Sequence, residues 1–109
     1  MDIFVVMDQH ILGRGVFGIF STIEKAEEFM NGYTVETGQL CMISQMSIIG
    51  ERISPRVFGG YIYDSFYDTH VLDGIYADPL DARDGINPGG IVVRYVIDYP
   101  DEKELLHNT

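Results

Sequence analysis

The residues with the clearest potential for chemistry are the glycines of Gly13-Arg14-Gly15-Val16-Phe17-Gly18, which match the pattern G-x-G-x-x-G. In a dinucleotide-binding fold, the third glycine of this pattern opens a helix whose N-terminus faces the pyrophosphate. Here Ile19 and Phe20 continue a strand pattern after that glycine, and the helical pattern begins only at Ser21. We therefore expect these glycines to form a hairpin turn between two strands.

An anion site is the alternative for the same turn. Tight glycine turns present backbone amides that bind phosphate without a basic surface. In this interpretation the protein binds or sequesters a nucleotide or another anion, and the residues concerned are Gly13, Arg14, Gly15 and Arg94.

A second concentration of chemical groups is the acidic and aromatic segment 61–84. The aspartates of residues 64–84 are accompanied by one basic residue, Arg83, so this stretch has a net charge of −5. Calcium would suit many carboxylates, but the D-x-D-x-D-G loop and its distal glutamate are missing. Aromatic rings supply buried area in protein interfaces, and surrounding charges steer a partner of opposite sign. We therefore predict a partner-binding surface formed by Tyr61, Tyr63, Asp64, Tyr67, Asp68, Asp73, Tyr76, Asp78, Asp81 and Asp84. The alternative places the aromatic rings in the core and the aspartates on solvated turns.

Side chains that could serve as nucleophiles or bases occur without a catalytic pattern around them. They are Ser54, Ser65, Cys41, His10 and His70. The chain has no G-x-S-x-G elbow and no helical histidine pair for zinc. Asp68 and His70 are two residues apart and would share a strand face. Such a pair is most often a surface histidine beside an acid, with no catalytic role. The sequence predicts a non-enzymatic protein with no cofactor and no metal.

Charge and hydropathy narrow the range of partners. The formal net charge is −10, and the few lysines and arginines are scattered, which disfavours nucleic acid as a partner. We expect a protein partner with a basic surface. The longest apolar runs are far shorter than the roughly 18 to 20 residues of a membrane span, so no membrane association is expected.

The N-terminal residues and the single cysteine bear on the cellular compartment and its redox state. Met1-Asp2-Ile3 lacks the basic residue of a secretory signal, which favours a cytoplasmic protein. Cys41 cannot form an intramolecular disulfide and is expected to be a buried, inert thiol.

The pattern of the chain predicts one domain over residues 1–109. Ser21-Thr22-Ile23-Glu24 is a capping box, apolar residues follow at helical spacing, and Gly32 suits a left-handed end, so we expect a helix at about residues 22–31. Turn-forming residues predict a long loop over 78–90, and residues 100–109 form a polar tail that is expected to fray. The expected strands are 2–8, 16–20, 40–49, 57–66, 70–76 and 91–99.

These elements define an α+β fold class. The order β-β-α-β-β-(β)-β predicts a single, mainly antiparallel sheet of five to six strands with the helix on one face. The nearly continuous apolar character of residues 91–99 places that strand in the middle of the sheet. The aromatic content exceeds what one core of this size would bury, which leaves a homodimer open.

The N-terminal third resembles a known pattern. Residues 3–6, 15–22 and 24–29 (IFVV, GVFGIFST and EKAEEF) are similar to small uncharacterised phage and bacterial proteins, in which a β-hairpin precedes a capped helix. The resemblance covers residues 2–32 and implies a prokaryotic or bacteriophage origin, in the cytoplasm of a bacterium or an infected cell. Together with the acidic aromatic segment, it favours an interaction module such as a phage-encoded inhibitor, immunity or counter-defence protein.

Overall fold

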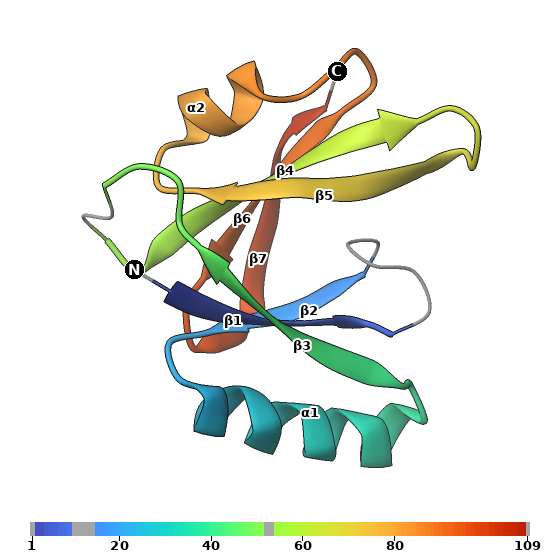
Figure 1. Cartoon of the computed structure of the whole chain (residues 1–109), viewed down its shortest axis with the longest axis vertical. Helices are drawn as coiled ribbons and strands as arrows, with labels where there is room; N and C mark the ends of the chain where they lie inside the picture. The colour runs from blue at the N-terminus through green and yellow to red at the C-terminus, as the bar shows by residue number, and fades with distance from the viewer. Residues whose placement is uncertain (1, 10–14, 52–53, 109) are drawn as a thin grey trace.

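The computed structural model describes residues 2–9, 15–51 and 54–108. They form two antiparallel sheets and two helices (Figure 1). The elements in chain order are β1 (Asp2–Asp8), β2 (Val16–Phe20), α1 (Ile23–Thr37), β3 (Cys41–Ser47), β4 (Arg56–Asp64), β5 (Thr69–Tyr76), α2 (Pro79–Asp84), β6 (Ile91–Val96) and β7 (Tyr99–Asn108). The α+β class is confirmed, but the predicted single sheet is wrong. The strands form a three-stranded sheet, β2-β1-β3, and a four-stranded sheet, β5-β4-β6-β7.

β1, the central strand of the first sheet, packs on both faces because it is apolar at nearly every position. Ile3, Val5 and Met7 point toward the second sheet and belong to the main core cluster. Phe4 and Val6 alternate with them and pack in the cluster beneath α1. A strand of this kind needs a covering layer on each side, which one helix cannot supply.

The second sheet has the same two-sided character. Val57 and Ile75 face the first sheet, whereas Phe58 and Val92 belong to a separate cluster with Ala82 of α2. The result is a four-layer stack in which α1 covers one sheet, the two sheets face each other, and α2 covers the other sheet (Figure 1).

Helix α1 is longer than the capping pattern indicated. Thr22 is the N-cap, and its Oγ1 accepts a hydrogen bond from the Lys25 amide at 3.2 Å. The helix passes through Gly32 and ends at Thr37, so the prediction that Gly32 ends it is wrong. Gly38 has a φ of 74° and closes the helix with its amide donating to the Thr34 carbonyl.

Helix α2 lies in the segment predicted to be a long loop. The Asp78 carboxylate accepts from the Leu80 amide at 2.7 Å, and Pro79 occupies the first turn. Ala82 is fully buried against the sheet. An Asp-Pro pair is a signature of a helix start as well as of a turn, and only the apolar surface beneath it decides between them.

The C-terminal segment also differs from expectation. β6 ends at Val96, Asp98 turns the chain with a φ of 70°, and the residues predicted to fray form strand β7. β6 lies between β4 and β7, which confirms its interior position. The charged residues 101–104 are typical of an edge strand, and their polarity is the reason that the sequence pattern did not predict β7. None of the described helices has the length and apolar character needed to cross a membrane.

Candidate interaction surfaces

The ten residues predicted to contact a partner are divided among three places. At the tip of the β4–β5 hairpin lie Tyr63, Asp64, Tyr67 and Asp68. On β5 beyond the tip and on α2, toward the other end of the hairpin, lie Asp73, Tyr76, Asp78, Asp81 and Asp84 (Figure 1). Tyr61 lies between the two sheets.

Tyr61 is a core residue. Its side chain is 4% exposed, and its hydroxyl forms a hydrogen bond with the hydroxyl of Tyr95 from β6. Burial raises the pKa of Tyr95 to about 12 and that of Tyr61 further still, so both phenols stay neutral. The prediction that Tyr61 lies on the partner surface therefore does not fit its position.

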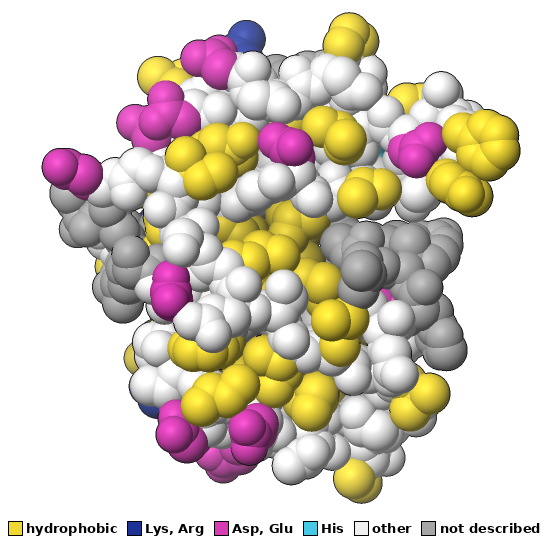
Figure 2. Space-filling view, in the orientation of Figure 1, with side chains coloured by type: hydrophobic (Ala, Val, Ile, Leu, Met, Phe, Trp, Pro, Cys, Tyr) yellow, Lys and Arg dark blue, Asp and Glu magenta, His cyan; other side chains and the backbone are white. Residues whose placement is uncertain are grey.

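The hairpin tip, by contrast, carries two exposed rings. Phe66 is 85% exposed and Tyr67 is 72% exposed. Their ring centroids lie 4.8 Å apart at an interplanar angle of 80°, an edge-to-face pair. Figure 2 shows hydrophobic side chains protruding at this end of the molecule beside an acidic one. The tip thus presents a compact aromatic knob to solvent.

Local hydrogen bonds hold the backbone of this tip. The Asp64 carboxylate accepts from the Phe66 amide at 2.9 Å, which closes an Asx-type turn. Asp68 has a φ of 50°, and its carboxylate accepts a bond of 2.6 Å from the Tyr63 hydroxyl. This hydrogen bond is the main reason that the pKa of Tyr63 is raised. The rings are therefore exposed on a turn whose shape is fixed.

The tip is also tied to the loop that follows α2. The Asn87 side chain accepts from the Tyr63 amide at 2.8 Å and donates to the Tyr63 carbonyl at 2.9 Å, so it mimics a neighbouring strand. The His70 Nε2 atom donates to the Gly89 carbonyl at 2.8 Å. These contacts anchor both strands of the hairpin close to the tip.

The aspartates at the α2 end have a different environment. Tyr76 is buried under the helix, and its hydroxyl donates to Asp73 at 3.1 Å. Asp78 caps α2, and Asp81 and Asp84 are exposed on its surface. Here the alternative expectation fits: the aromatic ring is in the core and the acids lie at the solvated surface.

Of the residues named in the anion alternative, the structure describes Gly15 and Arg94, and it does not bring these two together. Gly13 and Arg14 lie outside the described residues. Gly15 lines a cleft of about 420 Å³ between the sheets, together with Lys103. Arg94 points to the opposite face of β6 from the cleft-lining residues and forms an ion pair with Glu104 at 3.0 Å. Its Nε atom is buried without a hydrogen-bond partner among the residues described.

The groups considered for catalysis are likewise engaged or separated. Asp68 lies in the turn bonded to Tyr63, and His70 is bonded to Gly89, so the expected shared strand face is not formed. Cys41 lies on β3 near α1, is only partly buried, and has a pKa raised by that burial. Within residues 2–9, 15–51 and 54–108, no group of three or more potential ligands could hold a metal ion.

A groove beside α1 was not predicted from the sequence. It has a volume of about 620 Å³ and opens between α1 and the turn joining β6 to β7. From the helix, positions 25, 28, 29, 32, 33 and 36 line it, a spacing that puts them on one flank. Phe20, Asp98, Tyr99 and Pro100 complete it. The helical spacing is legible in the sequence, but the opposite wall comes from a distant segment.

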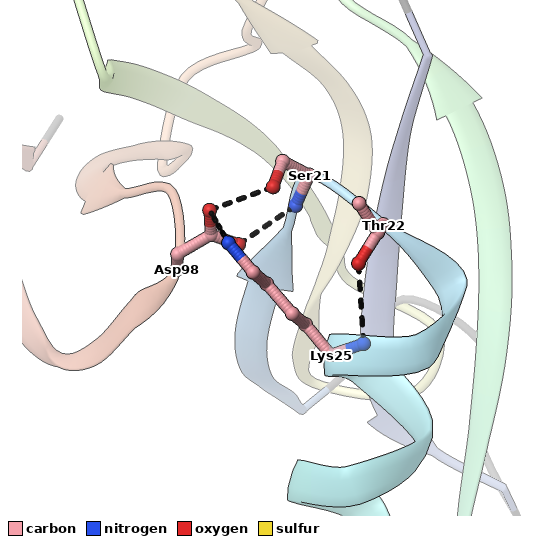
Figure 3. A network of polar contacts seen from close by, with 4 residues as sticks. All are labelled: Ser21, Thr22, Lys25 and Asp98. Atoms are coloured by element: carbon pink, nitrogen blue, oxygen red, sulfur yellow. Dashed lines mark hydrogen bonds and ion pairs between the residues drawn. The ribbon is translucent and has the colours of Figure 1, made fainter.

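A network of polar contacts fixes that wall to the helix (Figure 3). The Asp98 carboxylate accepts from the Ser21 amide at 2.8 Å and from the Ser21 hydroxyl at 2.7 Å, and it pairs with the Lys25 ammonium at 3.1 Å. Burial alone would raise the pKa of Asp98, but these hydrogen bonds and the positive charge of Lys25 outweigh it and lower the pKa.

A comparison of the chain with protein-family models, curated proteins and solved structures finds no match. Function is therefore inferred from the residues and their arrangement.

Proposed function

We propose that this protein is a non-enzymatic interaction module that binds a basic partner protein through the tip of the β4–β5 hairpin. The observation that carries this proposal is the exposure of Phe66 and Tyr67 side by side on a turn that hydrogen bonds hold in shape.

Two adjacent exposed aromatic rings offer apolar area that a partner can bury. Each ring buries roughly 150 to 250 Å² when it enters an interface, and residues of this type dominate binding energy in many complexes. Because the tip is already held by Asp64, Tyr63 and Asn87, its ordering is not a cost of association. The knob is thus suited to insertion into an apolar pocket.

The charge around the knob favours a basic partner. Asp64 and Asp68 flank the two rings, and the whole chain has a net charge of −10. Opposite charges at the rim of an interface steer association and select the partner more than they add affinity. An inhibitor, immunity or counter-defence protein that blocks a basic surface of a bacterial target would work in this way.

The test is capture of partners from a bacterial lysate at about 0.1 M salt, with three forms of the protein. We expect the wild type to retain a basic protein and the double variant Phe66→Ser, Tyr67→Ser to lose it by about 30-fold or more. Val35→Ser is the matched control, because Val35 is 86% exposed on α1, away from the tip. Release at about 1 M salt, where charges are screened beyond roughly 3 Å, would support the charge argument. Equal capture by the double variant and the wild type would refute the proposal.

The anion alternative can be tested on the same material. A nucleotide or phosphate that bound only the native state would raise the melting temperature with the logarithm of its concentration once that concentration exceeds the dissociation constant. We expect no such rise, because Arg94 is paired with Glu104 on the face away from Gly15. A rise with one nucleotide that continued to increase with the logarithm of its concentration would instead favour ligand binding over the interaction module.

A further inference from the structure

We infer that the groove beside α1 is a second binding site, and that it accepts an arginine side chain of an extended peptide segment. The inference does not rest on the hairpin tip, because the groove is built from other elements.

Aromatic rings form the floor of this groove. Phe20 and Phe29 lie 5.1 Å apart between ring centroids, and Phe29 and Tyr33 lie 5.4 Å apart, so the rings form a continuous row. Tyr99 faces them from the start of β7 and is 62% exposed. Tyr33 is stacked between Phe29 and Phe17, whose ring centroid lies 4.7 Å away, so the faces of the row are largely covered by one another. Tyr99 has no ring contact among the described residues, and a planar guanidinium group stacks on an aromatic face of this kind and is attracted by its negative charge density.

The charges at the groove favour a cation. Its lining contains Glu28, Glu36 and Asp98 against one ammonium, that of Lys25. Lys25 and Asp98 neutralise each other at 3.1 Å. The negative charges of Glu28 and Glu36 remain uncompensated, because both residues are exposed and neither forms an ion pair in the part of the chain that the structure describes. They are eight positions apart on the helix, roughly 12 Å along its axis, so one lies toward each end of the row of rings.

Gly32 supplies an independent indication. A glycine within a helix costs about 0.5 to 1 kcal/mol relative to alanine, so its presence calls for a reason. Neither packing nor backbone conformation requires a glycine here, because a Cβ atom added at Gly32 would meet nothing within 4 Å and the residue has no positive φ. It lies between Glu28 and Glu36 in the lining of the groove, where any side chain would occupy the space above the helix. The glycine keeps this stretch of the groove open.

The opposite wall is held at a fixed distance from the helix. Asp98 is bonded to Ser21, which directly precedes the N-cap, and to Lys25 in the first turns of α1 (Figure 3). Tyr99 and Pro100 follow this anchored residue directly. The groove is therefore formed before any ligand arrives, as ligand sites usually are.

The test uses the full chain, labelled with ¹⁵N, and two short peptides observed by NMR. The probes are acetyl-Gly-Arg-Gly-amide and the same peptide with citrulline, which has nearly the shape of arginine without its charge. We expect saturable shifts of the Gly32, Tyr33 and Tyr99 amides with the arginine peptide and at least fivefold weaker binding of the citrulline peptide. Equal shifts with both peptides, or no shift at these amides, would overturn the inference.

Two sets of variants separate binding from structure. Glu28→Gln with Glu36→Gln should weaken the arginine peptide about five- to tenfold, whereas Glu24→Gln with Glu27→Gln, the same charge change on exposed residues outside the lining, should not. Gly32→Leu should abolish binding while the melting temperature stays equal or rises, because leucine favours the helix. Unchanged binding by Gly32→Leu would contradict the role assigned to this glycine.

Discussion

The hairpin tip and the groove beside α1 use the same residue types in opposite shapes. At the tip, Phe66 and Tyr67 project outward, and the nearby Asp64 and Asp68 are occupied by hydrogen bonds of the turn itself. In the groove the rings line a concave floor, and Glu28 and Glu36 have no partner among the described residues. Aromatic and acidic residues thus build a projecting knob in one place and a concave groove in the other.

The two regions also differ in what holds them. The tip depends on contacts between residues close in sequence, such as Tyr63 with Asp68, supplemented by Asn87. The groove depends on Ser21 and Asp98, which are 77 positions apart. The tip is therefore largely a local structure, whereas the groove exists only when the two sheets have assembled.

The largest expected effect on stability comes from a substitution in the groove wall. Asp98→Asn preserves the left-handed turn, which asparagine tolerates, but removes the charge that binds Ser21 and Lys25, so we expect a loss of about 1 to 2 kcal/mol in the free energy of unfolding. Because the pKa of Asp98 is lowered from 3.8 in the folded state, its stabilisation is present above that pH and lost as the pH falls below it. Urea unfolding at neutral pH and near pH 2 should show the difference from wild type shrinking toward zero. Asp101→Asn on β7 is the control, and a difference independent of pH would contradict this account.

A smaller effect is expected at the tip. Asp64→Ala removes the acceptor for the Phe66 amide and should cost about 1 kcal/mol, whereas Asp64→Asn keeps an acceptor and should stay close to wild type. NMR order parameters of the Phe66 and Tyr67 amides should be about 0.85 in the wild type and fall toward 0.6 in the alanine variant. Low order parameters in the wild type would show that the tip is not fixed in advance.

Replacing Gly32 by alanine should increase the stability of the protein. Gly32→Ala fits without a steric clash and removes the backbone entropy cost of glycine, so we expect an increase of about 0.5 to 1 kcal/mol. Thermal unfolding by circular dichroism measures it. Gly38→Ala is the contrasting variant, because its φ of 74° makes alanine unfavourable there, and it should lower the stability. A loss on Gly32→Ala would indicate a structural need for this glycine.

The smallest effect on stability is expected for the ring that we assign to binding. Phe66→Ala should change the free energy of unfolding by no more than about 0.5 kcal/mol, because the ring is 85% exposed. Chemical unfolding measures this, with Phe58→Ala in the second sheet as a core contrast that should cost about 3 kcal/mol or more. A large loss from Phe66→Ala would mean that the ring serves the fold.

Local patterns in the sequence predicted much of the secondary structure. The strands at residues 2–8, 16–20 and 70–76 were placed within a residue or two, because alternation and β-branched residues are local signals. The ends of α1 were less well placed, since Ser21 and Gly32 suit a cap and a stop as well as Thr22 and Gly38 do. Only the tertiary surroundings select among them. The Ser21 hydroxyl donates to the Asp98 carboxylate, and Thr22 caps the helix instead.

By itself the sequence determined the class of the fold, the acidic charge and the concentration of aromatic and acidic residues around the β4–β5 hairpin. Tertiary structure decided that the strands divide into two sheets, that Tyr61 is buried against Tyr95 while Phe66 and Tyr67 stay exposed, and that α1 and the β6–β7 turn enclose a groove. The physical reason is that periodicity reports which residues can be buried, but burial itself depends on which distant surface covers them. A groove has two walls, and no local pattern records their pairing.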